Sequence, residues 1–326
     1  MKQFKSFSMI LLLLVLVSCS KVVTLNFEKH LYDVNASKIV WIQLPGYSEE
    51  MPMLLKLIEQ DALQKNPLET FNCTGKAWTY NLFDLKPAPM ASFHHQITGS
   101  KNIKNSCDDF INRPIWDLLS SQGFKTSVLE KSANPDEEIF WSKCKSQNDF
   151  KKNLSYFHMA KASEPDASYF HAEEPMLKLE VRDYFDRACQ KSSCTNSLFD
   201  NTKMLIEKAL LKEDKFLFII RDFSLWRALE KDIKNPVNII TTLKEISKIL
   251  GYLNLLREEN PDMLILLTSG QSLSVEIPLR VKPPFNSSPS VYSAVLARGA
   301  GAENFCGYFQ HEDIFKRILW KSGYNF

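Results

Sequence analysis

The sequence predicts an α/β fold in which a central, mostly parallel β-sheet is sandwiched by helices. Two observations support this prediction. Short apolar runs, typical of buried strands, alternate with longer segments that have helical periodicity. This strand–helix–strand order is typical of a parallel sheet covered by helices. The chain has 326 residues, 44% of them hydrophobic, which is enough for one large core or two smaller ones.

The first residues have the pattern of a secretory signal. Lys2 and Lys5 precede an apolar run over 9–17, which is shorter than the ~20 residues of a membrane-spanning helix. The run ends in the letters LVSC, which resemble a bacterial lipobox with Cys19 as the acceptor. We therefore expect cleavage after residue 18 and lipidation of Cys19. The alternative is an ordinary cleaved signal with a cysteine there by coincidence.

A lipid on Cys19 would make the membrane a partner of this chain. Burial of an acyl chain is worth ~0.8 kcal/mol per CH₂, so several chains hold a protein firmly. Residue 20 is serine rather than aspartate. By resemblance to lipoprotein sorting rules, this favours the outer membrane, with the protein facing the periplasm or the cell surface. Residues 19–37 are then a lipidated tether, and 38–326 the folded domain.

The charge balance argues against a nucleic-acid partner. The chain has 40 Lys and Arg residues against 38 Asp and Glu residues. The excess equals the two lysines of the signal, so the remaining chain is neutral. Surfaces that bind nucleic acid or anionic lipid through charge carry an excess of basic residues. We therefore expect no nucleic-acid partner.

The cysteines predict disulfides. Six of the seven cysteines lie beyond Cys19, and an even number is typical of a disulfide framework in an exported chain. Cys189 and Cys194 are the expected local pair, and the sequence leaves the other pairings open. Zinc binding is the alternative, but the chain has no Cys-x-x-Cys pair and no clustered histidines.

The first half of the domain contains one complete strand–helix–strand unit. An apolar strand over 37–44 ends at Pro45-Gly46 and is followed by a helix over 50–65 with one apolar face. After an irregular stretch, a helix over 111–121 leads into a strand over 124–129.

The middle segment, 130–201, has a different composition. It is polar, rich in charged and aromatic residues, and holds three cysteines. We interpret it as an inserted cap with little regular structure. The apolar patterns then return in a helix over 202–211, a strand over 215–220, a helix over 237–259, strands over 263–267, 276–281 and 291–297, and a final helix over 312–320.

Four stretches, in chain order, carry a resemblance to a known family. They are the strand ending at Pro45-Gly46, the segment 89–101 with its Thr-Gly pair, the two strands that precede Asp222 and Gly270, and the segment 297–307 with the Asp-Ile-Phe that follows it. Together they resemble the alkaline phosphatase-like superfamily of phosphatases, phosphodiesterases and sulfatases. The resemblance implies an α/β sandwich. It also implies two metal ions, usually zinc, that activate a Ser, Thr or modified Cys nucleophile.

The resemblance places most catalytic positions on residues that cannot perform this chemistry. The metal-ligand Asp positions of the family fall on Pro45 and Gly270, and the nucleophile position falls on Pro89. The metal-ligand His positions fall on Trp226, Gln271 and Ser288. Asp222 is the one ligand retained. Proline, tryptophan and glycine offer zinc no side-chain ligand atom. Proline at a helix start costs no hydrogen bond, so the scaffold can persist without the reaction.

The sequence therefore predicts a non-catalytic envelope lipoprotein that binds a small-molecule or glycan ligand, or a partner protein, without a cofactor or metal. We expect a ligand pocket formed by Asp222, Trp226, Gln271 and Ser92, in which Trp226 could stack on a sugar or another ring. Two alternatives remain. One is a zinc-dependent hydrolase of phosphate or sulfate esters with relocated catalytic groups. The other is a structural or assembly lipoprotein whose former cleft is filled.

Overall fold

A computed structural model describes most of the domain. It covers residues 34–324 apart from 60–65, 133, 135–136, 141–143, 145–146, 163–166, 171–182, 191–192, 232–235 and 277–285. The expected signal, Cys19 and nearly all of the expected tether lie outside these residues. Among the helices described, none combines the length and the apolar character needed to span a bilayer.

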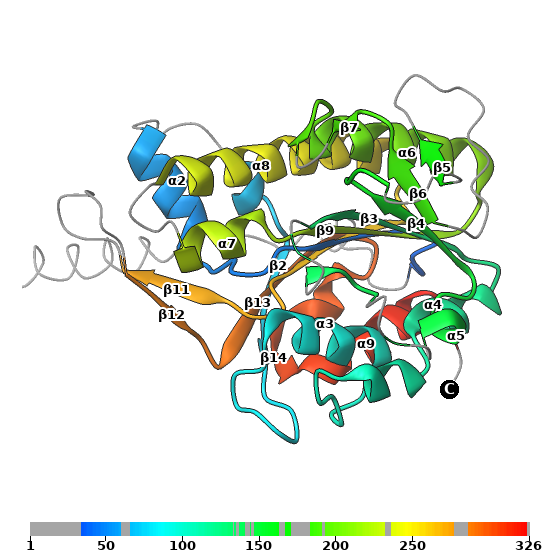
Figure 1. Cartoon of the computed structure of the whole chain (residues 1–326), viewed down its shortest axis with the longest axis horizontal. Helices are drawn as coiled ribbons and strands as arrows, with labels where there is room; N and C mark the ends of the chain where they lie inside the picture. The colour runs from blue at the N-terminus through cyan, green and yellow to red at the C-terminus, as the bar shows by residue number, and fades with distance from the viewer. Residues whose placement is uncertain are drawn as a thin grey trace, which may run out of the picture. The chain divides into compact units, whose positions relative to one another are not determined.

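Ten strands form one sheet (Figure 1). In spatial order they are β14 (Gly307–Gln310), β2 (Cys73–Trp78), β13 (Tyr292–Gly299), β10 (Met263–Thr268), β1 (Lys38–Gln43), β9 (Phe216–Asp222), β3 (Lys125–Lys131), β4 (Leu154–His158), β6 (Asp183–Asp186) and β5 (Ser168–Phe170). In this sheet β13 is antiparallel to both of its neighbours, and every other pair is parallel. The predicted fold class, a mostly parallel sheet, is confirmed.

The central strands are buried on both faces, which explains their continuous apolar sequences. In β1, Val40 and Ile42 join the core on one side of the sheet, whereas Ile39 and Trp41 join the core on the other. Successive side chains of a strand point to opposite faces. All residues of β9 and β10 are buried.

Helices cover the two faces of the sheet (Figure 1). One layer contains α2 (Met51–Glu59), α6 (Leu198–Lys212), α7 (Ser224–Lys231) and α8 (Pro236–Glu259), and the other contains α3 (Pro89–Thr98), α4 (Ile115–Ser120), α5 (Gln147–Phe150) and α9 (His311–Lys321). Short 3₁₀ turns are η2 (Pro67–Glu69), η3 (Cys107–Ile111) and η5 (Ala302–Phe305). The predicted helices over 50–65, 111–121, 237–259 and 312–320 correspond to α2, α4, α8 and α9, although the last residues of the first prediction are not described.

Helix α6 begins four residues before the predicted start. Its N-cap is Ser197, whose hydroxyl accepts a hydrogen bond from the backbone N–H of Asp200, while the Asp200 carboxylate accepts one from the backbone N–H of Ser197. This reciprocal arrangement satisfies backbone donors that a helix start otherwise leaves unpaired. Ser197 and Asp200 were therefore the signal in the sequence that marks where α6 begins.

The segment 130–201 differs from the expected irregular cap. Its strands β4, β6 and β5 extend the main sheet beyond β3. Aromatic side chains hold this extension together, with the Phe157 ring stacked on Tyr184 at 4.9 Å and edge-on to Phe170 at 5.2 Å. Cross-strand aromatic pairs stabilise short strands whose overall composition is polar. The aromatic residues that suggested irregular structure therefore form the packed face of an edge.

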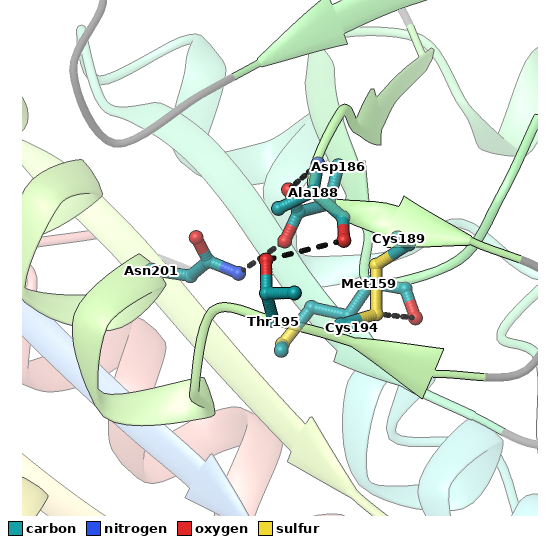
Figure 2. Close-up of a disulfide and its surroundings, with 7 residues drawn as sticks. All are labelled: Met159, Asp186, Ala188, Cys189, Cys194, Thr195 and Asn201. Atoms are coloured by element: carbon teal, nitrogen blue, oxygen red, sulfur yellow. Dashed lines mark hydrogen bonds between the residues drawn. A yellow bond between two sulfur atoms is a disulfide. The ribbon is translucent and has the colours of Figure 1, made fainter.

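The expected disulfide between Cys189 and Cys194 is present in the structure (Figure 2). It joins the two-residue strands β7 (Cys189–Gln190) and β8 (Ser193–Cys194). The carboxylate of Asp186 lies within 4.8 Å of both sulfur atoms, but it accepts hydrogen bonds from the Ala188 backbone and the Asn201 side chain. The sulfur atoms are bonded to each other and are not zinc ligands.

Two further disulfides link distant segments. Cys73 at the start of β2 is bonded to Cys306 just before β14, and Cys107 in η3 is bonded to Cys144. The first closes a loop of 233 residues. It therefore fixes the two strands at this edge of the sheet to each other.

Candidate functional site

The strands β3, β9, β1 and β10 end beside one another, so their last side chains form a row. Gln43 of β1 pairs in register with Arg221 of β9 on one side and with Thr268 of β10 on the other. Glu130 of β3 pairs with Arg221. In α/β folds with parallel strands, ligands bind at this carboxyl edge of the sheet.

Arg221 and Glu130 form an ion pair in this row, and both side chains are almost fully buried. The guanidinium of Arg221 also donates from Nε to the side-chain oxygen of Gln43 at 3.0 Å. It lies over the ring of Phe93, with 4.1 Å between the guanidinium carbon and the ring centroid. The other oxygen of Glu130 accepts hydrogen bonds from the Ile139 backbone N–H and the Tyr156 hydroxyl. A buried charge pair is tolerated only when hydrogen bonds satisfy its remaining atoms, as they do here.

The position of Arg221 bears on metal binding. Its Nη2 contacts the sulfur of Met90 at 2.9 Å, beside Pro89 at the first turn of α3. The resemblance placed the nucleophile and the zinc ions around this helix start. A buried guanidinium would repel a metal ion there, and Pro45, Pro89 and Gly270 supply no ligand atom. The residues present therefore do not fit a pair of zinc ions.

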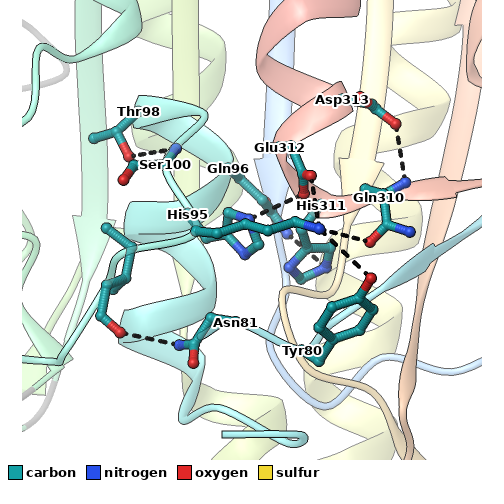
Figure 3. A network of polar contacts seen from close by, with 12 residues as sticks. Tyr80, Asn81, His95, Gln96, Thr98, Ser100, Gln310, His311, Glu312 and Asp313 are labelled. Carbon is teal, nitrogen blue, oxygen red and sulfur yellow. Dashed lines mark hydrogen bonds and ion pairs between the residues drawn. The ribbon is translucent and has the colours of Figure 1, made fainter. Parts of the chain in front are cut away.

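A second polar network continues from this row towards α9 (Figure 3). The side-chain oxygen of Gln96 accepts a hydrogen bond from Thr268 at 2.9 Å, and its amide nitrogen lies 3.4 Å from Nε2 of His311. Nearby, the Glu312 carboxylate pairs with His95 and Lys101, at 3.1 Å in each case. Burial alone would raise the pKa of Glu312, but hydrogen bonds from His95, its own backbone and Lys101 lower it to about 2.

Three histidines stay neutral near pH 7, namely the buried His94 and His311 and the partly buried His158. Burial lowers the pKa of His94 to about 4, assisted by the nearby charge of Arg221. Burial also lowers the pKa of His158 to about 4, and it lowers that of His311 well below the usual range. Desolvation disfavours the charged form of each ring. These histidines are part of the folded interior.

The structure brings several of the predicted site residues together. Pro89 is the first residue of α3, as the resemblance implied. A Cβ built on Gly270 would lie 3.7 Å from the Pro89 carbonyl and 3.7 Å from the Ser92 side chain. Trp226 lies beside the turn that follows Pro45, because a Cβ on Gly46 would be 3.3 Å from the Trp226 backbone. These positions, which the resemblance assigned to catalysis, therefore lie close together.

Ser288 is the exception. It lies in β12 (Asn286–Pro289), which pairs with β11 (Leu273–Glu276) in a separate two-stranded sheet, and its side chain is exposed. The resemblance located this position only by counting back along the chain from Gly299. The separate sheet formed by β11 and β12 accounts for the difference.

A cleft of about 530 Å³ opens at the first turn of α3 and α7. Of the four expected pocket residues, only Trp226 lines it. The other three are buried and engaged elsewhere. Asp222 accepts a hydrogen bond from the Ser224 backbone and lies 3.7 Å from Lys131, Ser92 donates to the Pro87 carbonyl, and Gln271 donates to the Lys86 carbonyl. Three of the four expected pocket residues therefore lie behind this cleft wall, because their side chains bond to backbone atoms or to Lys131.

The cleft walls are aromatic and polar. Phe223 and Trp226 supply the aromatic surface, and Glu230, Asn105 and Asn134 supply hydrogen-bonding groups. Arg227 pairs with Glu137 across one wall and donates to the Ser224 hydroxyl at 3.1 Å. Among the described lining residues there is no Ser, Thr, Cys or His, so the cleft wall offers no side chain of the types expected for nucleophilic attack.

No protein-family model matches the sequence, and no curated protein matches it. Solved structures do match. An alkaline phosphatase from Thermus thermophilus superposes with a TM-score of 0.73 over 91% of this chain and 93% of its own, at 10% identity. The enzyme from the Antarctic bacterium TAB5 superposes with a TM-score of 0.68 over 90% and 100%, at 15% identity. The chain has the alkaline phosphatase fold. A lipoteichoic acid synthase from Listeria monocytogenes shares it more distantly, with a TM-score of 0.54, 12% identity and coverage of 90% and 74%.

Arg221, Glu130 and Glu137 were missed from the sequence. The predicted strands over 124–129 and 215–220 stop immediately before Glu130 and Arg221, because an isolated charged residue reads as the end of a buried strand. The sequence did contain a signal for Glu130 and Arg221, because each is a charged residue directly after a buried apolar run. In a parallel sheet such residues meet at one edge, where opposite charges can pair.

The buried ion pair predicts a strong thermodynamic coupling. Arg221→Met and Glu130→Gln should each lower the free energy of unfolding by about 3–5 kcal/mol, because each leaves one buried charge unpaired. The double variant should lose clearly less than the sum of the two single losses. Urea denaturation measures these values. The exposed pair Arg113–Asp117 is the control, with an expected coupling of about 0.5 kcal/mol or less. Additive losses at Arg221 and Glu130 would contradict the pairing.

The lowered pKa values of His94 and His158 predict acid sensitivity. The folded pKa of His94 and of His158 lies near 4, below the unfolded value of about 6.5. The unfolded chain therefore binds more protons in this window, and stability should fall as the pH drops from about 6.5 to 4. Glu138 acts in the opposite sense, because burial and the charge of Glu130 raise its pKa to about 7. The two histidines should outweigh it.

The variant His158→Phe tests this account. The His158 ring stacks on Phe185 at 4.5 Å, so phenylalanine keeps the stacking and removes the titration. Thermal melts at pH 4.5 and pH 7.5 should show a smaller acid loss for the variant than for the wild type. An unchanged acid loss would show that this histidine does not contribute.

Proposed function

We propose that this protein is a non-catalytic envelope lipoprotein whose cleft binds a sugar-ring ligand. The observation that carries the proposal is the composition of the cleft wall: two aromatic side chains, several hydrogen-bonding groups, and no Ser, Thr, Cys or His among the described lining residues. Binding sites for small molecules commonly combine an apolar or aromatic wall with a few polar groups that fix orientation.

The charge of the cleft favours a neutral ligand. Glu137 and Arg227 neutralise each other, which leaves Glu230 as the remaining ionisable side chain among the described residues that line the cleft. The Arg221 guanidinium beneath it is fully buried and held by protein atoms. A phosphate or sulfate ester would therefore meet no accessible excess of positive charge. A sugar ring could stack on Trp226. Its hydroxyl groups could donate hydrogen bonds to the carboxylate of Glu230 and to the amide oxygens of Asn105 and Asn134.

The alternative is hydrolysis of phosphate or sulfate esters, the chemistry implied by the resemblance. The fold is shared with alkaline phosphatases, but a fold alone does not establish an activity. The missing ligand atoms at Pro45, Pro89 and Gly270 and the buried Arg221 argue against it. The other alternative, a filled cleft used only for assembly, is less well supported because the cleft has a volume of about 530 Å³.

Binding of envelope saccharides tests the proposed function. Full-length protein in detergent should bind a subset of cell-wall or outer-membrane oligosaccharides in calorimetric titrations. Trp226→Ala should weaken this binding about tenfold, because aromatic contacts are worth about 1 kcal/mol or more. The control is Trp320→Ala, since Trp320 is 59% exposed on α9 and does not line the cleft. Turnover of a phosphate or sulfate ester by zinc-loaded protein that is abolished by Trp226→Ala would instead support the hydrolase.

The proposed lipid anchor has a separate test. Cys19→Ala should prevent lipidation, so the protein should no longer incorporate radiolabelled palmitate in a bacterial host. It should also leave the outer-membrane fraction obtained on a density gradient, because the acyl chains provide the membrane affinity. The control is Ser20→Ala, which keeps the acceptor cysteine. Equal palmitate incorporation by wild type and Cys19→Ala would show that the lipobox resemblance is accidental.

A further inference from the structure

A second, smaller cavity lies apart from the cleft and shares no lining residue with it. Its volume is about 90 Å³, and it lies between the start of α2, the strand β11 and the antiparallel strand β13. The polar groups around it are mainly oxygen atoms: serine hydroxyls from three segments of the chain and the carboxylates of Glu49 and Glu50. Lys76 is the one cationic side chain among the described lining residues.

Two oxygen atoms at this cavity lack a partner. The hydroxyl of Ser48, a residue only 5% exposed, makes no hydrogen bond, and neither does Oε2 of Glu50. The other oxygen of Glu50 accepts a hydrogen bond from Ser274 at 3.0 Å, which fixes the carboxylate in place. Buried polar atoms are nearly always satisfied, so these two oxygen atoms are available to hold a bound group.

The charges indicate the sign of that group. Lys76 pairs with Glu49 at 3.0 Å and also interacts with the charge of Glu50, so one cation faces two carboxylates among the described lining residues. This part of the structure is therefore locally negative and fits a cation.

We propose that the cavity binds a hydrated hard divalent cation, Ca²⁺ or Mg²⁺, through Oε2 of Glu50 and the hydroxyl of Ser48. Both ions prefer oxygen ligands, and both tolerate sites with few carboxylates when water completes the coordination. The volume is enough for an ion with several waters. The absence of sulfur and imidazole ligands from the described lining disfavours zinc and copper.

The proposed ion would connect two segments that already meet at the backbone. The Gly46 N–H donates to the Gln271 carbonyl at 2.8 Å, and the Leu273 N–H donates to the Gly46 carbonyl at 3.2 Å. An ion shared by Ser48 and Glu50 beside Ser274 would hold the loop after β1 against β11 more firmly. This inference does not depend on the ligand of the cleft.

The test is a titration of chelator-treated, full-length protein with Ca²⁺ and, separately, with Mg²⁺ in a calorimeter. We expect one site per chain with a dissociation constant of about 10⁻³ M or tighter for at least one ion. Terbium luminescence provides a second measurement, because Tyr292 lines the cavity and would transfer energy to a bound Tb³⁺. Displacement of Tb³⁺ by the preferred ion should quench this emission.

Three variants and a control make the test specific. Glu50→Gln should weaken binding at least about tenfold, because it removes the ligand charge, and Ser48→Ala should weaken it less. Lys76→Met should tighten binding severalfold, because it removes a competing cation and frees Glu49, and a misfolded variant would not show such a gain. The control Glu259→Gln, at the exposed end of α8, should bind as the wild type does. The proposal is overturned if neither ion binds, or if binding survives Glu50→Gln unchanged.

Discussion

The buried ion pair between Arg221 and Glu130 is the interaction on which the carboxyl edge of the sheet depends. It joins the ends of β9 and β3, and through Gln43 it reaches the end of β1. The same guanidinium packs on Phe93 and Met90 of α3, so it also positions the helix that carries Pro89. A charge pair in this place keeps the strand ends together. The guanidinium of Arg221 is also a fixed positive charge, which would repel a metal ion from the same space.

The fold is compatible with the residues at the positions that the resemblance assigned to catalysis. Pro89 suits the first position of a helix, and Gly270 adopts a positive φ of 65°. Inward-facing strand-end residues such as Asp222 and Gln271 bond to nearby backbone atoms. The outward-facing residues of α7 then define the cleft. The wall that faces solvent is therefore aromatic and polar, and the sheet supports it from behind.

The central fold could be predicted because its signals are local. A strand such as β1 is a continuous apolar run, and α8 repeats its apolar residues at helical spacing over many turns. The edge strands β4, β6 and β5 could not be predicted in this way. They are short, and residues such as Phe157 and Tyr184 are recognised as strand residues only when they lie opposite each other. Their stability comes from tertiary packing, which a single sequence does not display.

The sequence by itself determined the fold class and the local disulfide between Cys189 and Cys194. These properties depend on residue types and on neighbours close in the chain. Only the tertiary structure decided which polar residues face the cleft and which are buried behind it. Glu130 and Arg221 lie 91 residues apart in the chain, yet they pair in register because parallel strands bring their carboxyl ends to one edge. Register and side-chain direction are properties of the assembled sheet, and they turned an expected pocket around Asp222 into a cleft around Trp226.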